Sequence, residues 1–243
     1  MENIEAEAVI CDIEGTTTSI SFVKDELFPF SKKNVLNFLT QNCDNSEVKL
    51  IFNELQHLPD YKGKFYEDVD STSISEIAAF AIQLIDEDKK LGPLKKLQGL
   101  IWQEGFDQGL LKGHIYSDVL PAFKTWTENQ IKIFIYSSGS VQSQKLLFGN
   151  SVEGNLLSYI SAYFDTTVGY KQEPQSYENI LSNINLPAEK VVFFTDVVQE
   201  AEAATNAGIK AVLLERPGNS PFTEKSRSSF IVIKSFDEII IKK

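Results

Sequence analysis

Short, continuous runs of apolar residues recur along the chain, and longer amphipathic stretches separate them. The first run, residues 8–11, ends at Asp12, and the last third of the chain contains four more, at 131–136, 191–195, 211–214 and 230–233. The first run is apolar at every position, which indicates a strand that is buried on both faces, and the others read as further short strands. Because helical stretches separate the runs, we predict an α/β fold, a Rossmann-like parallel sheet with helices on both faces.

The segment between the first two runs, roughly residues 25–115, has helical periodicity instead. Ser73 and Glu76 have the spacing of a capping box at the start of one helix. Gly92-Pro93 ends that helix and begins the next, in which leucines recur at helical spacing. This segment therefore contains a series of helices.

These patterns predict two domains in a chain of 243 residues, which is long enough to bury a core without disulfides. Residues 1–20 and 116–243 would form the catalytic core. Residues 21–115 would form a helical cap that is inserted after the first strand.

The charge balance excludes some classes of partner. The chain has 34 acidic and 23 basic residues, a net charge of −11, which opposes broad binding to nucleic acid or to anionic lipid. The acidic N-terminus does not resemble a signal peptide, and no apolar run approaches the roughly 18 residues of a membrane span. Two cysteines, Cys11 and Cys43, form neither a disulfide framework nor a zinc motif, which favours a reducing compartment.

Polar residues cluster where the apolar runs end. Asp12 and Glu14 follow the first run, Ser137 and Ser138 the second, and Asp196 the third. The carboxyl ends of parallel strands share one edge of the sheet, where ligands bind in open α/β folds. Three acids at one edge do not all ionise cheaply without a cation, and oxygen ligands of this kind suit Mg²⁺. If the extended conformation continues past the first strand, Glu14 points to the same side as Asp12.

Structural roles are the alternatives for each of these residues. Acids and serines after strands commonly cap helices, and a single lysine such as Lys171 is commonly a surface charge. Glu200, four residues after Asp196, either supports a metal through a water or holds Lys171. His57 and His114 lie too far apart in sequence to indicate a metal site, although His114 is a candidate for the pocket wall.

The motifs resemble those of a known superfamily. Four segments occur in the order of the four motifs of haloacid dehalogenase-like hydrolases. They are residues 12–17 (Asp-Ile-Glu-Gly-Thr-Thr), the hydrophobic strand that ends in Ser137, the single residue Lys171, and the pair Thr195-Asp196. Phosphatases of that superfamily usually carry a second aspartate where this chain has Glu14. With this glutamate, the sequence of the longer run 12–23 resembles that of the enolase-phosphatases of methionine salvage. The resemblance continues at residues 113–119, 136–140, 164–166 and 176–177.

The resemblance implies roles for these residues. Asp12 would be the nucleophile that forms an aspartyl-phosphate, and Glu14 would transfer protons to the leaving oxygen. Asp12, Asp196 and the main-chain carbonyl of Glu14 would hold one Mg²⁺ per chain. Ser137, Ser138 and Lys171 would bind the phosphate of the substrate.

The substrate that this resemblance implies is 2,3-diketo-5-methylthiopentyl-1-phosphate, which would be enolised and then dephosphorylated to 1,2-dihydroxy-3-keto-5-methylthiopentene. A monomeric, cytoplasmic enzyme is expected, with presence in the nucleus allowed, and neither nucleic acid nor membrane is an expected partner. The alternatives are a related phosphatase of another small ester and a catalytically silent module that binds a phosphorylated ligand. The second is disfavoured because a silent module has no need of the nucleophile, both acids and the lysine.

Overall fold

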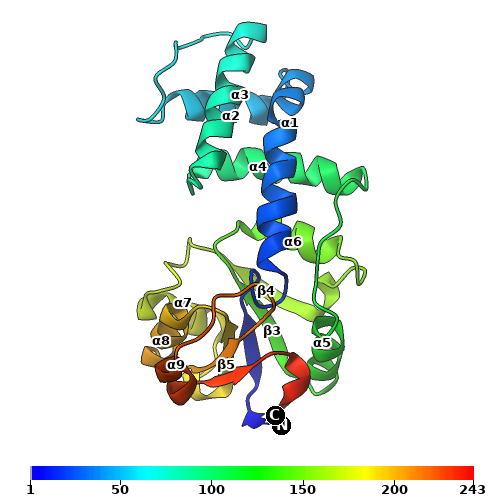
Figure 1. Ribbon diagram of the computed structural model, residues 1–243, viewed down its shortest axis with the longest axis vertical. Coiled ribbons are helices and arrows are strands. Elements are labelled where there is room, and N and C mark those ends of the chain that lie inside the picture. The colour runs from blue at the N-terminus through cyan, green and yellow to red at the C-terminus, as the bar shows by residue number, and fades with distance from the viewer. Residues whose placement is uncertain (1) are drawn as a thin grey trace. The chain divides into compact units, whose positions relative to one another are not determined.

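Six parallel strands form the main sheet of the computed structural model, which describes residues 2–243 (Figure 1). The strand order is β4-β3-β2-β5-β6-β7, so β2 lies in the interior of the sheet between β3 and β5. The bounds are β2 (Ala8–Cys11), β3 (Lys132–Tyr136), β4 (Ile160–Phe164), β5 (Val191–Thr195), β6 (Lys210–Leu214) and β7 (Ile231–Ile233). The prediction of a parallel α/β sheet is confirmed.

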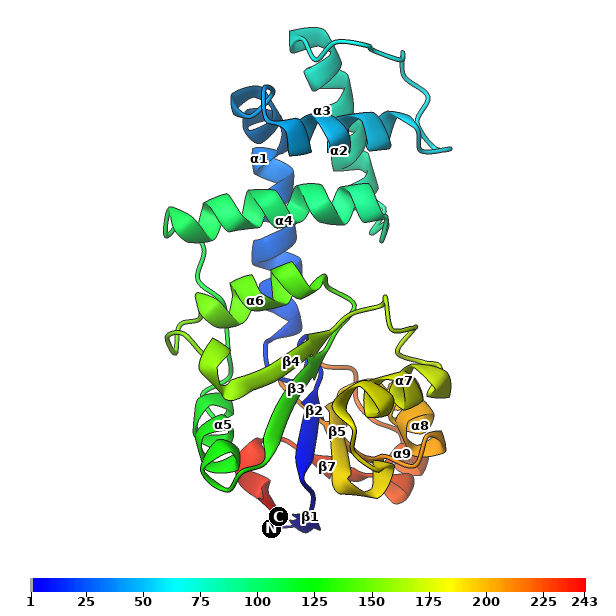
Figure 2. The same cartoon turned by 180° about the vertical axis from the view of Figure 1, so that it is seen from behind.

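Helices cover both faces of this sheet, with α5 and α6 on one side and α7, α8 and α9 on the other (Figure 2). Their bounds are α5 (Val119–Glu128), α6 (Val141–Gly149), α7 (Pro174–Ile184), α8 (Val198–Asn206) and α9 (Glu224–Ser229). Every residue of β2 is fully buried. Ala8 and Ile10 pack in one apolar cluster with Phe193 and Ala201, and the alternate residues face the opposite layer. This two-sided burial explains why the run is apolar at every position.

The sequence pattern did not predict three of the strands. β4 lies at one edge of the main sheet, and β1 (Glu2–Glu5) pairs in parallel with β8 (Ile239–Lys242) in a separate two-stranded sheet. β4 has one exposed and two half-buried positions among its five residues. β1 buries one of its four residues, and β8 buries two of four. Such short, half-exposed strands lack the continuous apolar run that identified the others.

A second compact unit consists of helices that pack around an apolar cluster of their own. A short π-helix, η1 (Phe22–Leu27), leads into α1 (Phe28–Gln41), α2 (Ser46–Gln56), α3 (Ser71–Asp86) and α4 (Gly92–Asp107). Ile51, Leu55, Ile77 and Leu84 are fully buried in the shared cluster. The helical periodicity of this segment is confirmed, with Gly92-Pro93 at the start of α4 as predicted.

The predicted capping box at Ser73 and Glu76 is wrong. α3 begins at Ser71, and its N-cap is Asp70, whose carboxylate accepts the Ser73 N–H at 2.8 Å. The Ser73 hydroxyl accepts the Asp70 N–H in return, also at 2.8 Å. Aspartate is as good an N-cap as serine, so the helix begins one turn earlier than the Ser-x-x-Glu pattern indicates.

Contacts between Cα atoms divide the chain into one unit that comprises residues up to 23 with 112–243 and another that comprises residues 24–111. These limits lie within four residues of the predicted boundaries at 20/21 and 115/116. The assignment of the two units as a catalytic core and an inserted helical cap stays a prediction.

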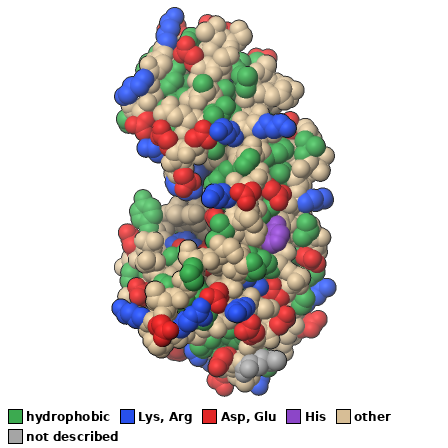
Figure 3. Space-filling view, in the orientation of Figure 1, with side chains coloured by type: hydrophobic (Ala, Val, Ile, Leu, Met, Phe, Trp, Pro, Cys, Tyr) green, Lys and Arg blue, Asp and Glu red, His purple; other side chains and the backbone are tan. Residues whose placement is uncertain are grey.

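The molecular surface carries charges of both signs. On the face in Figure 3, acidic and basic side chains are interspersed over both units. Within residues 2–243, no helix combines the length and the apolar character that a membrane span requires.

Candidate active site

Asp12 is the first residue after the interior strand β2. Its N–H donates to the carbonyl of Phe194 on β5 at 2.9 Å, which fixes it beside the end of that strand. Asp12 is 5 % exposed, and Oδ1 of its carboxylate accepts the N–H of Ile13 at 2.7 Å. A carboxylate this deeply buried requires charged or hydrogen-bonding partners, which the neighbouring residues supply.

The chain turns sharply after Asp12. The carbonyl of Ile13 accepts the N–H groups of Thr16, Thr17 and Thr18, and Gly15 adopts a left-handed φ of 73°. The turn replaces the extended conformation from Ile13 onward, so the condition under which strand alternation would put Glu14 on the same side as Asp12 is not met. The direction of the Glu14 side chain stays a prediction. Asp12 is buried, whereas Glu14 is exposed.

Asp196 follows the neighbouring strand β5 and lies directly against this turn. A Cβ atom on Gly15 would lie 2.4 Å from Oδ2 of Asp196, so only glycine permits this approach. Burial, and then the negative charge of Asp12, raise the pKa of Asp196 from 3.8 to about 7. The structure thus brings together two of the three predicted metal ligands, with an unfavourable repulsion between their carboxylates.

Lys171 lies between Asp12 and Glu200. Its Nζ is 2.7 Å from Oδ1 of Asp12 and 2.7 Å from Oε2 of Glu200, and both Lys171 and Glu200 are 8 % exposed. Burial alone lowers the pKa of Lys171, but the two carboxylates raise it above its ordinary value, so the ammonium stays charged. Lys171 is therefore not a surface residue. Of the two roles considered for Glu200, support of a metal through a water or contact with Lys171, the structure has the contact with Lys171.

Ser137 and Ser138 follow β3, the strand on the other side of β2. The hydroxyl of Ser137 is buried and accepts the N–H of Gly139 at 3.3 Å, whereas Ser138 is exposed. The N-cap of α6 is Ser140, which accepts the N–H of Ser143. Neither predicted serine is the helix cap, and both lie at the same sheet edge as Asp12.

Comparison with known proteins identifies the family. A family model described as haloacid dehalogenase-like hydrolase matches residues 6–208. The chain belongs to this family of hydrolases.

Two relatives of this hydrolase carry the name Enolase-phosphatase E1. The protein from Drosophila sechellia is 48% identical over 234 residues, which cover 95% of this chain and 91% of the relative. The protein from Drosophila ananassae is 46% identical, with 98% and 96% of the two chains covered. Nearly the whole hydrolase is thus similar to proteins of this name.

Solved structures are also similar to the chain. The UTR4 protein (Unknown transcript 4 protein) of Saccharomyces cerevisiae is 34% identical with a TM-score of 0.78, and the match covers 96% of this chain and 99% of that one. CbbY from Rhodobacter sphaeroides, solved in complex with xylulose-(1,5)bisphosphate, has a TM-score of 0.54 at 14% identity, with 97% of both chains covered. At that identity, the second comparison demonstrates a shared fold alone.

The donors at this edge of the hydrolase fit a hard cation. Within residues 2–243, no three side chains from His, Cys, Asp and Glu are grouped as a ready-made metal site. Asp12 and Asp196 instead offer two carboxylates, and burial, followed by the negative charge of Asp12, raises the pKa of Asp196. Mg²⁺ typically takes one or two carboxylates and completes its shell with carbonyl oxygens, waters and substrate phosphate.

Two residues of the hydrolase with buried charges were not recognised as important from the sequence. Arg216 and Asp118 form an ion pair at 2.8 Å, and both are buried. Residues 216–219 have only the pattern of a turn after a strand, and Asp118 stands out only as part of the run 113–119 that resembles the enolase-phosphatases. For Arg216 the available signal was that it follows β6 closely, at the same sheet edge as Asp12.

His114 makes contacts within its own unit. Its Nδ1 accepts the main-chain N–H of Ser19 at 3.1 Å, and its ring packs edge-on against Tyr116. These contacts give His114 a structural role in joining two segments of the chain, and a place in the pocket wall stays a prediction.

Proposed function

We propose that this hydrolase is the Mg²⁺-dependent enolase-phosphatase of methionine salvage. It enolises 2,3-diketo-5-methylthiopentyl-1-phosphate and then removes the phosphate, which gives 1,2-dihydroxy-3-keto-5-methylthiopentene. The observation that supports this most strongly is the buried contact of Asp12 with Lys171, next to Asp196, in a chain 48% identical to an Enolase-phosphatase E1. A charged lysine beside a nucleophilic carboxylate suits an anionic phosphate ester.

In the proposed phosphatase reaction, Asp12 is the nucleophile. Because Oδ1 is held by Ile13 and Lys171, we assign the attack on phosphorus to Oδ2. The phosphorus–oxygen bond to the substrate breaks, and the leaving oxygen takes a proton from Glu14. Water, which gives a proton to the Glu14 carboxylate, then attacks the phosphorus of the aspartyl-phosphate; the phosphorus–oxygen bond to Asp12 breaks, which releases phosphate and restores the carboxylate of Asp12 and the protonated Glu14.

The remaining residues bind the phosphate and disperse its charge. The ammonium of Lys171 is held by Glu200 at a fixed position next to Asp12. The hydroxyls of Ser137 and Ser138, and the main-chain N–H groups that precede α6, are donors for the phosphoryl oxygens. Together they replace the water that would otherwise solvate the charge that develops on these oxygens.

One Mg²⁺ per chain would be held by Asp12, Asp196 and the main-chain carbonyl of Glu14. When bound, the ion supplies positive charge that neutralises the phosphate and stabilises an enolate. In this assignment the main-chain carbonyl of Glu14 holds the ion, and its side chain transfers protons, both at the leaving oxygen and at carbon. The exposure of Glu14 supports this division, because an exposed carboxyl can reach a substrate that enters from solvent.

The test is product analysis with the diketo phosphate. We expect the enol chromophore and free phosphate to form together, and EDTA to abolish both until Mg²⁺ is added back. A panel of sugar and nucleotide phosphates is the control. Faster turnover of any panel member would replace this proposal with a phosphatase of another small ester. A monomeric state and a cytoplasmic location stay predictions.

A further inference from the structure

Arg216 is buried behind the turn that follows the nucleophile. It is 6 % exposed and lies two residues after β6. Its Nε donates to the carbonyl of Thr16 at 3.0 Å, and its Nη1 donates to the carbonyl of Lys234 at 3.0 Å. Its Nη2 donates to Oδ2 of Asp118 at 2.8 Å. The guanidinium therefore connects the nucleophile turn to two distant parts of the core unit.

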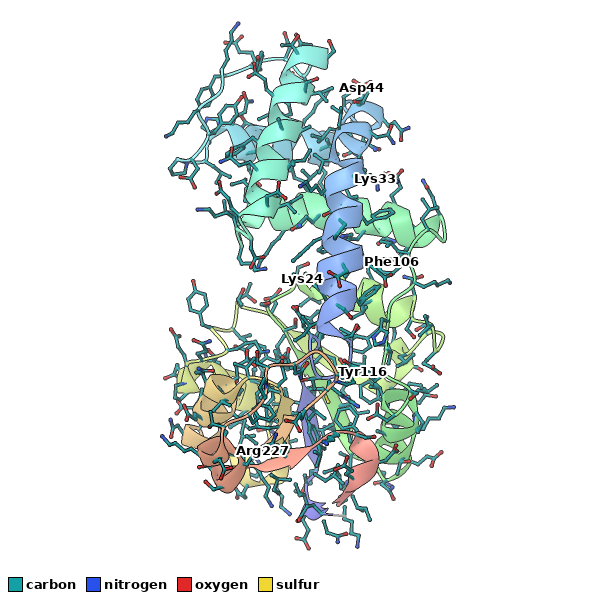
Figure 4. All side chains as sticks on the ribbon, viewed as in Figure 1. Lys24, Lys33, Asp44, Phe106, Tyr116 and Arg227 are labelled. Carbon is teal, nitrogen blue, oxygen red and sulfur yellow. The ribbon has the colours of Figure 1, made fainter. Side chains whose placement is uncertain are left out.

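Aromatic rings and a carboxylate hold this guanidinium in one orientation. Its central carbon lies 4.4 Å from the ring centre of Tyr116 and 5.2 Å from that of Phe236. Asp118 also accepts the N–H of Phe236 at 2.6 Å and the hydroxyl of Ser235 at 3.1 Å. A planar fork that is stacked and ion-paired in this way loses little further freedom when it donates to Thr16. Figure 4 labels Tyr116 near the carboxyl-terminal edge of the sheet.

Asn219 holds the adjacent carbonyl of the same turn. Its Nδ2 donates to the carbonyl of Gly15 at 2.9 Å and to that of Leu214 at 3.1 Å. Only the amide nitrogen can face two carbonyl oxygens, which fixes the orientation of the side chain. Two consecutive carbonyls after the nucleophile are thus held by side chains from residues 216–219.

These contacts act at the point where the predicted metal site is assembled. Within the turn, the carbonyls of Ile13 and Thr18 accept N–H groups from the turn itself, whereas those of Gly15 and Thr16 are held by Asn219 and Arg216. The peptide plane before Gly15 contains the carbonyl of Glu14. Gly15 has a left-handed φ and lies against the carboxylate of Asp196, so a rotation at Gly15 would move both predicted ligands relative to each other.

We propose that Arg216 and Asn219 are positioning residues for the magnesium site. They hold the Gly15–Thr16 segment so that the carbonyl of Glu14 and the carboxylate of Asp196 converge, and neither touches substrate or metal. This inference rests on the proposed function, because it assumes that the carbonyl of Glu14 is a Mg²⁺ ligand. It assigns residues 216–219 a role that the sequence pattern of a simple turn does not indicate.

The experiment measures Mg²⁺ binding directly, by isothermal titration calorimetry on the full chain without substrate. Asn219→Ala removes the two hydrogen bonds that Nδ2 donates, to Gly15 and to Leu214, and leaves no buried charge unpaired. Arg216→Lys keeps the charge opposite Asp118 but loses the donors to Thr16 and Lys234. We expect each variant to bind Mg²⁺ about five- to tenfold more weakly, the effect of losing its one hydrogen bond to the turn, about 1–1.4 kcal/mol. At saturating Mg²⁺, kcat should stay within about twofold of the wild type, because the nucleophile and Lys171 are unchanged.

The chain offers a matched control, since Arg227 is its other arginine. Arg227 lies on α9 and is exposed; it pairs with Glu215, which directly follows β6, rather than with the turn after Asp12 (Figure 4). Arg227→Lys should bind Mg²⁺ with wild-type affinity. The melting temperature of each variant distinguishes positioning of the magnesium site from a general contribution to the stability of the fold. A lower melting temperature with an unchanged Kd for Mg²⁺ would overturn the inference.

The two proposals fail in different ways. If the wild type binds no Mg²⁺, the proposed metal site itself is wrong and the inference falls with it. If the wild type binds Mg²⁺ and Asp196→Ala does not, the site stands. In that case, a Kd for Mg²⁺ in Asn219→Ala equal to that of the wild type overturns only the role of the 216–219 segment. Because Asn219→Ala leaves no buried charge unpaired, this variant decides the question even if Arg216→Lys does not fold.

Discussion

Lys171 and Glu200 form a buried ion pair, with 2.7 Å between the Nζ of the lysine and Oε2 of the glutamate. The hydroxyl of Thr195 also donates to Oε2 of Glu200 at 2.7 Å, so the glutamate is held at both the end of β5 and the lysine. The same ammonium lies 2.7 Å from Asp12. Glu200 therefore fixes the position of the cation beside the nucleophile and keeps it protonated.

Replacement of Glu200 by glutamine tests this relationship. Glu200→Gln keeps the size of the side chain and removes its charge, so Lys171 loses one of two anionic partners. We expect kcat/KM to fall about 10- to 150-fold, as for the loss of a charged hydrogen bond of about 1.5–3 kcal/mol. The alkaline limb of the pH profile should also move to lower pH, because the pKa of Lys171 falls. Glu202→Gln, on the exposed side of α8, is the control and should change neither quantity.

Asp12 can be tested as the nucleophile by a nearly isosteric change. Asp12→Asn removes the attacking charge, and loss of one member of a catalytic unit commonly lowers turnover by about a thousandfold or more. Beryllium trifluoride, a phosphate mimic, should form its adduct on Asp12 in the wild type and none in the variant. A circular dichroism spectrum and a melting curve establish that the variant is folded. An adduct on another residue would contradict the assignment.

The sequence predicted the parts of the site that directly follow buried strands. Asp12, Ser137 and Asp196 each follow a largely apolar run, and parallel strands must bring the ends of such runs to one edge. The pattern alone therefore places these residues together without knowledge of the loops.

The remaining residues belong to loops whose course depends on tertiary contacts. Lys171 follows β4, an edge strand with too few buried residues to appear in the pattern. Arg216 reaches the turn after the nucleophile across 200 positions of sequence, and its partner Asp118 is 98 positions away. Strand periodicity carries no information about such pairs, and for Lys171 only the resemblance to a family supplied the position.

The raised pKa of Asp196 predicts how the stability of the metal-free protein depends on pH. Between about pH 4 and pH 7 the folded protein retains a proton on Asp196 that the unfolded chain, with a pKa of 3.8, has lost. The unfolded state then binds fewer protons than the folded state, so the contribution of Asp196 to stability falls as the pH rises through this window.

Melting temperatures at pH 5 and pH 8, in EDTA and in Mg²⁺, test this prediction. We expect Mg²⁺ to raise the melting temperature more at pH 8, where the ion does not compete with a proton on Asp196. Asp196→Asn should make the gain small at both pH values, and Asp237→Asn, an exposed change, should leave the wild-type pattern. An equal gain at pH 5 and pH 8 in the wild type would show that Asp196 does not titrate in this range.

Glu14 gives the sharpest test of the enolase-phosphatase mechanism, because it is the residue that departs from the common Asp-x-Asp motif. Glu14→Gln preserves size and polarity but cannot exchange a proton at neutral pH. We expect phosphate release to slow by about 100-fold or more, the usual contribution of a positioned general acid. Mg²⁺ affinity should stay near that of the wild type, because the main-chain carbonyl of residue 14, and not its side chain, is the proposed ligand.

The enol chromophore and free phosphate, followed in the same sample, separate the two roles of Glu14. If Glu14 moves the carbon proton as well, both signals slow together; if it acts only on the leaving oxygen, the enol accumulates ahead of phosphate. Glu14→Asp is the matched variant, since it restores an acid that is one methylene shorter and should recover part of the lost rate. Phosphate release at the wild-type rate in Glu14→Gln would place the general acid elsewhere, and the longer side chain would then have no part in the proton transfers.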